Sequence, residues 1–410
     1  MHLFTQDQMG HKPGNRNYEQ DIVFVTKHNK WVLRSIGIWP SVLKGAARFL
    51  PKIVIGIGNF ALLFAIIPCI LYIVFEERDI VMKLKLIGLV GFCVTSLLMY
   101  LALIARKPKI EDCIEQVQID WMQIEFPRDR ELMLKYGQVG RNLTVLSAVF
   151  MYSGGIFYYT ILQYAIGTFI DEHNRTIRPV IYPTYSVLFD VQTSPIYEIV
   201  YTMHCMCGYM MYSTTAGTCG LAALFATHAC GQIDVVASHL SDLVHSEHNE
   251  KTSTLDRRFV QIIEHHLRIL RFSAAIDFML REICLVQLVS STCIICLLEY
   301  YCLTDWEQRN TLSLTTYTVL LISLTFNIFI LCYIGDLLME KTSSVGQSCF
   351  MIEWYNLPSK TIQGLILVIA MSGSPAKISA GSIADLSLSM FVNILKTTVA
   401  YLSILRTSVM

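Results

Sequence analysis

Residues 53–75 read IVIGIGNFALLFAIIPCILYIVF, a run of 23 residues without a charged side chain. About 20 apolar residues in an α-helix cross the hydrocarbon core of a bilayer, so this run predicts a membrane-spanning helix. Five more runs of this kind follow along the chain, at 86–105, 143–166, 196–226, 283–303 and 312–335. Together the six runs predict an all-α, polytopic membrane protein.

A seventh run, at 383–405, is apolar but richer in polar residues than the others. Lipid cannot hydrogen-bond a polar stripe on a spanning helix, so such a stripe must face water or protein. Two interpretations stay open: the helix packs closely on its neighbours, or several copies meet around an axis and line an aqueous path. The polar and small residues recur at steps of four and three, on one helical stripe: Ser389, Asn393, Lys396, Ala400, Ser403 and Thr407.

The overall composition argues against several other classes of protein. With 53% hydrophobic and 16% charged residues, a soluble surface would be short of polar groups. The formal net charge is zero, so we expect no nucleic-acid partner. Most of the thirteen cysteines fall inside apolar runs and are interpreted as small core hydrophobes. We expect no cleavable signal peptide, because residues 1–30 carry charges without an apolar core between them.

The lysines and arginines predict the orientation of the chain. The segment to Lys52 holds eight of them, the loop 106–141 seven, the loop 226–272 five and the segment 341–382 three, whereas the alternate loops hold about six. The positive-inside rule therefore places the N-terminus in the cytoplasm. Seven spans then place the C-terminus outside the cell.

The spans and their orientation predict how the chain is organised. Apolar residues continue at helical spacing through 226–272, so both neighbouring spans are expected to extend into the cytoplasm, where 344–371 or a second subunit covers them. Asn174-Arg-Thr lies in the predicted extracellular loop and is a candidate glycosylation site. The predicted segments are a cytoplasmic N-terminal segment at 1–50, helices one to four at 51–225 with an extracellular loop at 167–195, cytoplasmic helical extensions at 226–274, helices five and six at 275–340, a cytoplasmic helix and loop at 341–382, and the seventh helix at 383–410.

No motif in the sequence supports catalysis or a bound cofactor. The chain has no His-Glu-x-x-His, paired-cysteine cluster, phosphate-binding glycine loop or Gly-x-Ser-x-Gly. His245-x-x-His248 has a spacing that could share a metal ion, but a solvated or interhelical role fits it better. We therefore expect neither an enzyme nor a metalloprotein.

Aromatic and thioether side chains gather in the outer halves of the middle spans. Around glycines, such side chains can shape an apolar cavity for a small organic ligand. The same residues also pack ordinary helix bundles, so this interpretation stays open. The candidates are Phe92 and Cys93 on the second span, Tyr152, Gly155, Ile156 and Tyr159 on the third, Met203, Met206 and Met210 on the fourth, and Tyr317 and Leu321 on the sixth.

The C-terminal third carries a specific series of motifs. They are Cys332-x-x-Gly335-Asp336, Trp354-Tyr355-Asn356-Leu357-Pro358, Ser372-Gly373-Ser374-Pro375, Ile378-Ser379-Ala380-Gly381, and Leu386-Ser387-Leu388 with Phe391, Ile394-Leu395-Lys396, Tyr401 and Leu405-Arg406. In the order and spacing of these motifs the chain resembles an insect odorant receptor of the variable, ligand-tuning type. The first two thirds agree with that family only in span count, orientation and loop lengths.

The resemblance implies a subunit that joins a shared co-receptor in a tetrameric, odorant-gated, non-selective cation channel. Its setting would be the plasma membrane of olfactory neuron dendrites, with membrane lipid, conducted cations and a volatile small molecule as the other partners. The cytoplasmic helices would anchor subunit to subunit, and the odorant would bind among spans two, three, four and six. The seventh helix would line the pore with Asn393, Lys396, Ala400, Ser403, Ile404, Thr407 and Ser408, where Ile404 marks the narrow gate and Lys396 is unusual for a cation path.

Three other membrane classes fit the sequence less well. A G-protein-coupled receptor would have the opposite orientation, and neither Asp-Arg-Tyr after the third span nor Asn-Pro-x-x-Tyr in the last is present. An insect gustatory receptor would end in Thr-Tyr-x5-Gln-Phe, whereas here Ala400-Tyr401 is followed by Arg406-Thr407. A transporter would be expected to show internal repeats, and none is visible.

Overall fold

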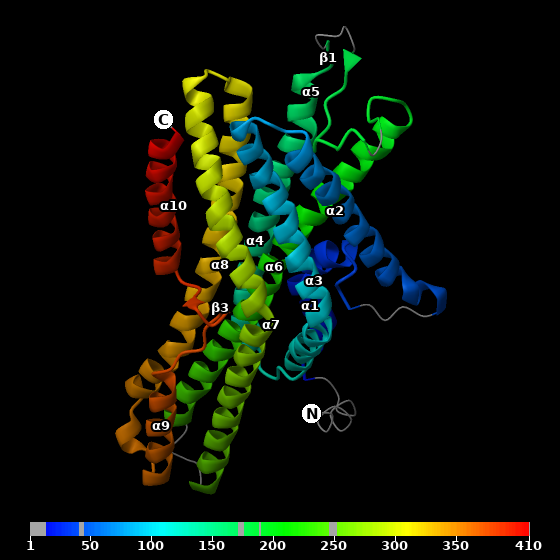
Figure 1. Ribbon diagram of the computed structural model, residues 1–410. Coiled ribbons are helices and arrows are strands. Elements are labelled where there is room, and N and C mark those ends of the chain that lie inside the picture. The colour runs from blue at the N-terminus through cyan, green and yellow to red at the C-terminus, as the bar shows by residue number, and fades with distance from the viewer. Residues whose placement is uncertain (1–13, 41–44, 171–175, 188–189, 246–251, 410) are drawn as a thin grey trace.

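The computed structural model describes residues 14–40, 45–170, 176–187, 190–245 and 252–409, and it forms one elongated helical bundle (Figure 1). The six predicted spans are confirmed, because six helices in the described part are long and apolar enough to cross a membrane. The predicted orientation of the termini stays a prediction. The six helices are α2 (Leu50–Phe75), α3 (Ile80–Met122), α4 (Pro127–Ile156, continued by the π-helical turn η2, Phe157–Ile161, and by α5, Leu162–Ile166), α6 (Ile196–His245), α7 (Thr252–Glu307) and α8 (Thr311–Met351).

Helix α6 is the centre of the bundle. Within its most apolar segment 94% of the residues are buried, against 33–56% in the other five helices. Small residues allow this close packing: a Cβ added to Gly140 of α4 would lie 3.2 Å from the carbonyl oxygen of Ala223 in α6. Helices in membranes associate chiefly where small residues let their backbones approach. The remaining helices surround α6 and leave apolar side chains such as Phe60 and Ile87 exposed toward the surrounding membrane.

One end of the bundle extends beyond the predicted spans. Helices α6 and α7 continue as long helices there, as the apolar spacing predicted, and α8 does the same. Helix α9 (Ser359–Ser372) packs beside them at the lower left of Figure 1. Leu365 and Val368 of α9 are buried, and Gly364 faces Phe259 of α7. The short turn η3 (Trp354–Asn356) leads into α9. The segment 344–371 therefore covers part of these extensions, which is one of the two covers that the sequence left open.

The seventh helix, α10 (Leu388–Val409), stands at the edge of the bundle against α7 and α8 (Figure 1). Its 22 residues give a length of about 33 Å, which is enough to cross a bilayer core. It begins five residues later than the start of the predicted span at 383. The reason is a two-stranded hairpin, β3 (Ser379–Ala380) and β4 (Ala384–Asp385), which pairs Ser379 with Asp385 and Ala380 with Ala384.

The β3–β4 hairpin fastens α10 to its neighbours. The Asp277 carboxylate of α7 accepts hydrogen bonds from the backbone N and the Oγ of Ser379, both at 2.7 Å. The backbone N of Gly381 donates to the Arg281 carbonyl at 2.8 Å, and its positive φ of 61° explains a glycine there. Just before the hairpin, the amine of Lys377 lies 2.8 Å from the carboxylate of Asp385, and this contact raises the pKa of the Lys377 amine.

The end of the bundle opposite α9 carries the loop that was predicted to be extracellular. Its described part contains the hairpin β1 (Phe169–Ile170) and β2 (Thr176–Ile177), and then irregular chain (Figure 1). Asn174, the predicted glycosylation site, lies outside the described residues.

A polar chain crosses the core of the bundle. The Nε2 of Gln287 on α7 donates to Oδ1 of Asn327 on α8 at 2.6 Å, and Nδ2 of Asn327 donates to Oγ of Ser147 on α4 at 2.9 Å. All three side chains are buried. Because hydrocarbon offers no replacement partner, these bonds hold three helices in register.

Replacing Asn327 with leucine is expected to lower the free energy of unfolding by about 1–2 kcal/mol, because Gln287 and Ser147 lose their shared partner. Chemical denaturation of the detergent-solubilised protein, followed by circular dichroism, measures this change. Asn59→Leu is the matched control, because its amide donates only to Ile55 of its own helix. Equal losses in the two variants would contradict the role of the polar chain.

Helix α1 (Tyr18–Ser35) packs on α3, α4 and α6, and the 3-10 turn η1 (Gly45–Phe49) precedes α2. Both carboxylate oxygens of Asp21 on α1 accept hydrogen bonds from Arg130 of α4, each at 2.7 Å, and Asn15 donates to the same carboxylate at 2.9 Å. Burial disfavours the charged carboxylate, but the bonds from Arg130 and Asn15 outweigh burial and lower the pKa of Asp21.

The Asp21 contact makes stability depend on pH. A carboxyl whose pKa is lowered by folding stabilises the protein above its unfolded pKa, and this contribution is lost as pH falls through the folded pKa. We expect Asp21→Asn to cost about 2 kcal/mol at pH 7 and progressively less from about pH 4 downward. Denaturation of both proteins between pH 7 and pH 3 measures the difference, and a difference that grows toward low pH would contradict this sign.

Candidate functional site

Several of the predicted ligand-contacting residues meet in one buried cluster around Tyr212. The ring of Phe92 on α3 lies 5.7 Å from the Tyr212 ring, and Tyr152 of α4 shares a 2.8 Å hydrogen bond with Ser213. A Cβ on Gly155 would lie 2.7 Å from the Tyr212 ring, so only glycine leaves room for that ring. Apolar and aromatic side chains from α3, α4 and α6 thus converge at one point.

The π-helical turn η2 directs Tyr159 toward this cluster. One extra residue in the turn changes the direction of the side chains that follow and frees a backbone carbonyl. Tyr201 of α6 donates to that Tyr159 carbonyl at 2.9 Å. The Tyr159 side chain is 7% exposed, and the predicted residues Cys93 of α3 and Met210 of α6 are also buried.

Not all predicted contacts point toward the cluster. Ile156 is 61% exposed and Met206 is 36% exposed, so both side chains point away from the packed helices. Adjacent positions on a helix differ by about 100°, which explains why Gly155 faces inward and Ile156 outward. Met203, Tyr317 and Leu321 are half-buried.

The loop between α5 and α6, which was predicted to be extracellular, adds residues that sequence reasoning missed. Ile181 and Tyr182 belong to this loop, yet they are only 4% and 0% exposed, because both side chains enter the bundle. His204 and Met211 of α6 are buried around Tyr182. The signal in the sequence is the apolar run Val180-Ile181-Tyr182 between Pro179 and Pro183.

The polar stripe of α10 faces away from its own bundle. Buried Ile394 and Thr398 point toward α7 and α8, and Thr398 donates to Glu299 of α7 at 3.1 Å. The side chains of Thr407 and Ser408 lie outside the described part of the structure. The exposed members of the predicted pore set are Asn393, Lys396, Ala400, Ser403 and Ile404.

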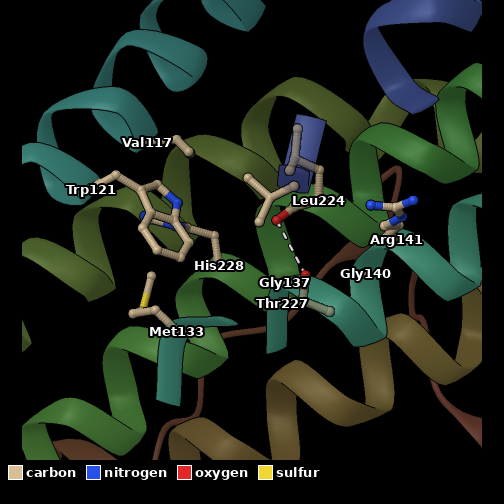
Figure 2. Close-up of a pocket in the computed structure, with 10 residues that line it drawn as sticks. Val117, Trp121, Met133, Gly137, Gly140, Arg141, Leu224, Thr227 and His228 are labelled. Atoms are coloured by element: carbon tan, nitrogen blue, oxygen red, sulfur yellow. Dashed lines mark hydrogen bonds between the residues drawn. The ribbon is translucent and has the colours of Figure 1, made fainter. Parts of the chain in front are cut away.

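A pocket lies away from the predicted ligand residues, between α1, α3, α4 and α6 (Figure 2). Trp121, Met133 and His228 line one part of it, and Gly140 and Arg141 line another. None of the predicted ligand-contacting residues lies on its wall.

A buried ion pair stands beside this pocket. Nε2 of His228 lies 3.0 Å from the Asp120 carboxylate, and the side chains are 3% and 6% exposed. Gln116 donates to Asp120 at 2.9 Å, and the Nε of Arg268 lies 3.8 Å away. This set links α3, α6 and α7.

Of the predicted histidine pair, His248 lies outside the described residues. Among the described residues, no three His, Cys, Asp or Glu side chains are placed to share a metal ion.

A family model described as 7tm Odorant receptor matches residues 80–399, more than three quarters of the chain. The chain belongs to the odorant receptor family. This confirms the resemblance that the C-terminal motifs indicated.

Curated relatives agree with this assignment, and a solved structure shares the fold. The chain is 23% identical to odorant receptor 13a of Drosophila melanogaster over 56% of this chain and 62% of that protein. It is 26% identical to the odorant receptor coreceptor of Aedes aegypti over 35% of this chain and 30% of that protein. The chain spans less than two thirds of the length of the first curated relatives that it matches. The insect olfactory receptor OR5 of Machilis hrabei, solved in complex with eugenol, shares the fold with a TM-score of 0.74 over 96% of this chain and all of that chain, at 12% identity.

The structure gives several motif residues of this odorant receptor a physical role. Gly335 and Asp336 of α8 lie against the start of α10: a Cβ on Gly335 would lie 2.5 Å from the Leu386 carbonyl oxygen, and Asp336 accepts from the backbone N of Leu388 at 3.4 Å. Ser379 and Gly381 fasten the β3–β4 hairpin to α7. These residues position the seventh helix.

Proposed function

We propose that this odorant receptor is the ligand-binding subunit of a ligand-gated cation channel and that it assembles with the odorant receptor co-receptor. The observation that carries the proposal is the exposed stripe of α10. The side chains of Asn393 and Lys396 are exposed and uncovered by the described part of the chain, and lipid cannot supply their hydrogen bonds. Water along a shared axis between subunits satisfies them.

The sign of the charge on this stripe supports a heteromeric assembly. A lysine at 396 raises the energy of a cation beside it, so a ring made only of this chain is a poor cation path. Co-receptor subunits that contribute other side chains dilute that charge. The conducted cations then pass between unlike helices, and Ile404, about two turns beyond Lys396, supplies an apolar constriction nearer the end of α10.

The ligand site of the proposal is the buried cluster around Tyr159 and Tyr212. Its walls are aromatic rings, thiols and thioethers, which bind small organic molecules chiefly by apolar contact. A volatile ligand that fits this cluster favours one arrangement of α3, α4 and α6 over another, and α8 transmits that preference to α10. Eugenol, the molecule in the OR5 structure of Machilis hrabei, serves as a first probe of this site. A receptor of this kind acts at the plasma membrane of olfactory neuron dendrites.

Co-expression tests the proposal. Three conditions are compared: this chain alone, the co-receptor alone, and the two chains together. In each condition, current is recorded while a panel of volatile compounds is applied. We expect ligand-evoked cation current from the pair that neither chain gives by itself. Ligand-evoked current from this chain alone would overturn the heteromeric assembly, and silence of the pair at confirmed surface expression would overturn the channel.

A second measurement tests the pore stripe. Lys396→Gln is expected to raise single-channel cation conductance, because it removes a positive charge from the path. Lys360→Gln on α9 is the matched control, since it also removes an exposed lysine but lies away from α10. Unchanged conductance in Lys396→Gln would place α10 off the axis.

A further inference from the structure

The side chain of Tyr182 is inserted into the helical bundle, where several polar groups contact its hydroxyl. Its hydroxyl bonds to the Tyr159 hydroxyl, accepts from the Cys93 thiol at 3.4 Å and donates to the Met211 thioether at 3.5 Å. The edge of its ring meets His204 at 5.0 Å between ring centroids. The wall of this site comes from α3, η2 and α6, whereas the occupant comes from the loop.

His204 is the second sign that this site serves a ligand. Its side chain is fully buried, and neither ring nitrogen has a hydrogen-bond partner. The ring lies between Tyr182 and Phe64 of α2, at 5.0 and 6.3 Å. A buried polar group without a partner destabilises a protein, so its presence needs an explanation.

The segment that carries Tyr182 is held at its two sides by contacts near the surface. On one side Tyr197 donates to the Pro179 carbonyl at 3.0 Å, and on the other the backbone N of Ser186 donates to Glu76 at 2.9 Å. Between these contacts residues 180–184 form neither helix nor strand. Segments of this kind open locally at low cost compared with the core of a bundle.

We propose that a small phenol displaces Tyr182 and binds in its place. This inference rests on the proposed function, because it names the ligand class of the same cluster. The ligand's ring replaces the tyrosine ring against Tyr159, and its hydroxyl takes over the bonds to Cys93 and Met211. Withdrawal of Tyr182 also exposes the nitrogens of His204 to the incoming ligand. Ligands without a ring or without a hydroxyl bind this site more weakly.

Direct binding tests this without relying on a current. The probes are p-cresol, which is the side chain of tyrosine as a free molecule, and toluene, which lacks only the hydroxyl. Thermal unfolding of the purified full chain in detergent is followed over a range of each probe, since a ligand of the folded state raises the unfolding temperature. We expect p-cresol to bind about tenfold more tightly than toluene, the effect of about one net hydrogen bond.

Two variants locate the binding. Tyr182→Phe keeps the ring of the occupant but removes its hydrogen bonds, so we expect p-cresol affinity to rise several-fold. Tyr185→Phe removes a hydroxyl from a neighbouring loop residue and is expected to change nothing. His204→Phe keeps the ring contact and is expected to reduce the preference for p-cresol over toluene.

The outcomes separate this inference from the proposed function. If Tyr182→Phe binds p-cresol more tightly and the co-expressed pair gives no current, the site is supported and the channel is refuted. Currents from other volatiles, with equal p-cresol affinity in Tyr182→Phe and the unmodified chain, would refute the displacement of Tyr182. Equal affinity for p-cresol and toluene would refute the phenol class.

Discussion

Asp120→Ala is expected to lower the free energy of unfolding of this receptor by about 3–5 kcal/mol, the range for breaking one partner out of a buried ion pair. The carboxylate of Asp120 is 6% exposed and lies 3.0 Å from His228, which is 3% exposed. Removing the carboxylate leaves the imidazole in an apolar region, where the ring of Phe272 stands 5.6 Å away.

Two controls separate the ion pair from simple loss of atoms. Arg128→Ala breaks the pair of Arg128 with Asp242, whose side chains are 60% and 45% exposed, and is expected to cost less than about 1 kcal/mol. The double variant Asp120→Leu with His228→Leu replaces the whole pair with apolar groups and is expected to recover most of the loss. Chemical denaturation in detergent gives all three values.

The stability of the double variant decides the meaning of the result. A single-variant loss as small as that of Arg128→Ala would show that the Asp120 contact is dispensable. A double variant as unstable as the single one would show that packing around α3, and not the unpaired histidine, is what the substitution disturbs.

The sequence predicted the spans because hydrocarbon imposes a length and a composition on every crossing helix. It also indicated that the α10 stripe must face water or protein, since lipid cannot hydrogen-bond Asn393 and Lys396, and the contact of that stripe with other subunits stays a prediction. The prediction treated the residues of the third span as one set, so it did not separate inward-facing Gly155 from outward-facing Ile156, although the 100° step between neighbours distinguishes them. In η2 the helix departs from the regular period, so the direction of Tyr159 needs the actual backbone.

Tyr182 marks the limit of this kind of reasoning. Its entry into the bundle depends on contacts with Cys93 and Met211, which are far away in the sequence, and an irregular loop has no period from which to infer them. The motifs around Gly335 show the complementary case. Their resemblance to a family was visible in the sequence, but the reason for the glycine, the approach of the Leu386 backbone, was visible only in the fold.

Gly335→Ala is expected to displace α10 and to reduce ligand-evoked current at least tenfold at equal surface expression. The added Cβ would lie 2.5 Å from both the Cβ and the carbonyl oxygen of Leu386, so the chain that begins α10 must shift. Leu386 is 1% exposed and its backbone N donates to the Ile378 carbonyl at 2.9 Å, so that chain has little freedom to move. Overpacking of this kind costs about 1–3 kcal/mol.

Gly91→Ala on α3 is the matched control, because nothing lies within 4 Å of a Cβ added there. Alanine is the better helix former at both positions by about 1 kcal/mol, so the control should be slightly more stable than the unmodified receptor and should conduct normally. The two substitutions are chemically identical, and any difference between them reports the contact with Leu386. Normal current in Gly335→Ala would mean that the hairpin before α10 yields without moving the helix, and that the position of α10 depends on its contacts with α7 instead.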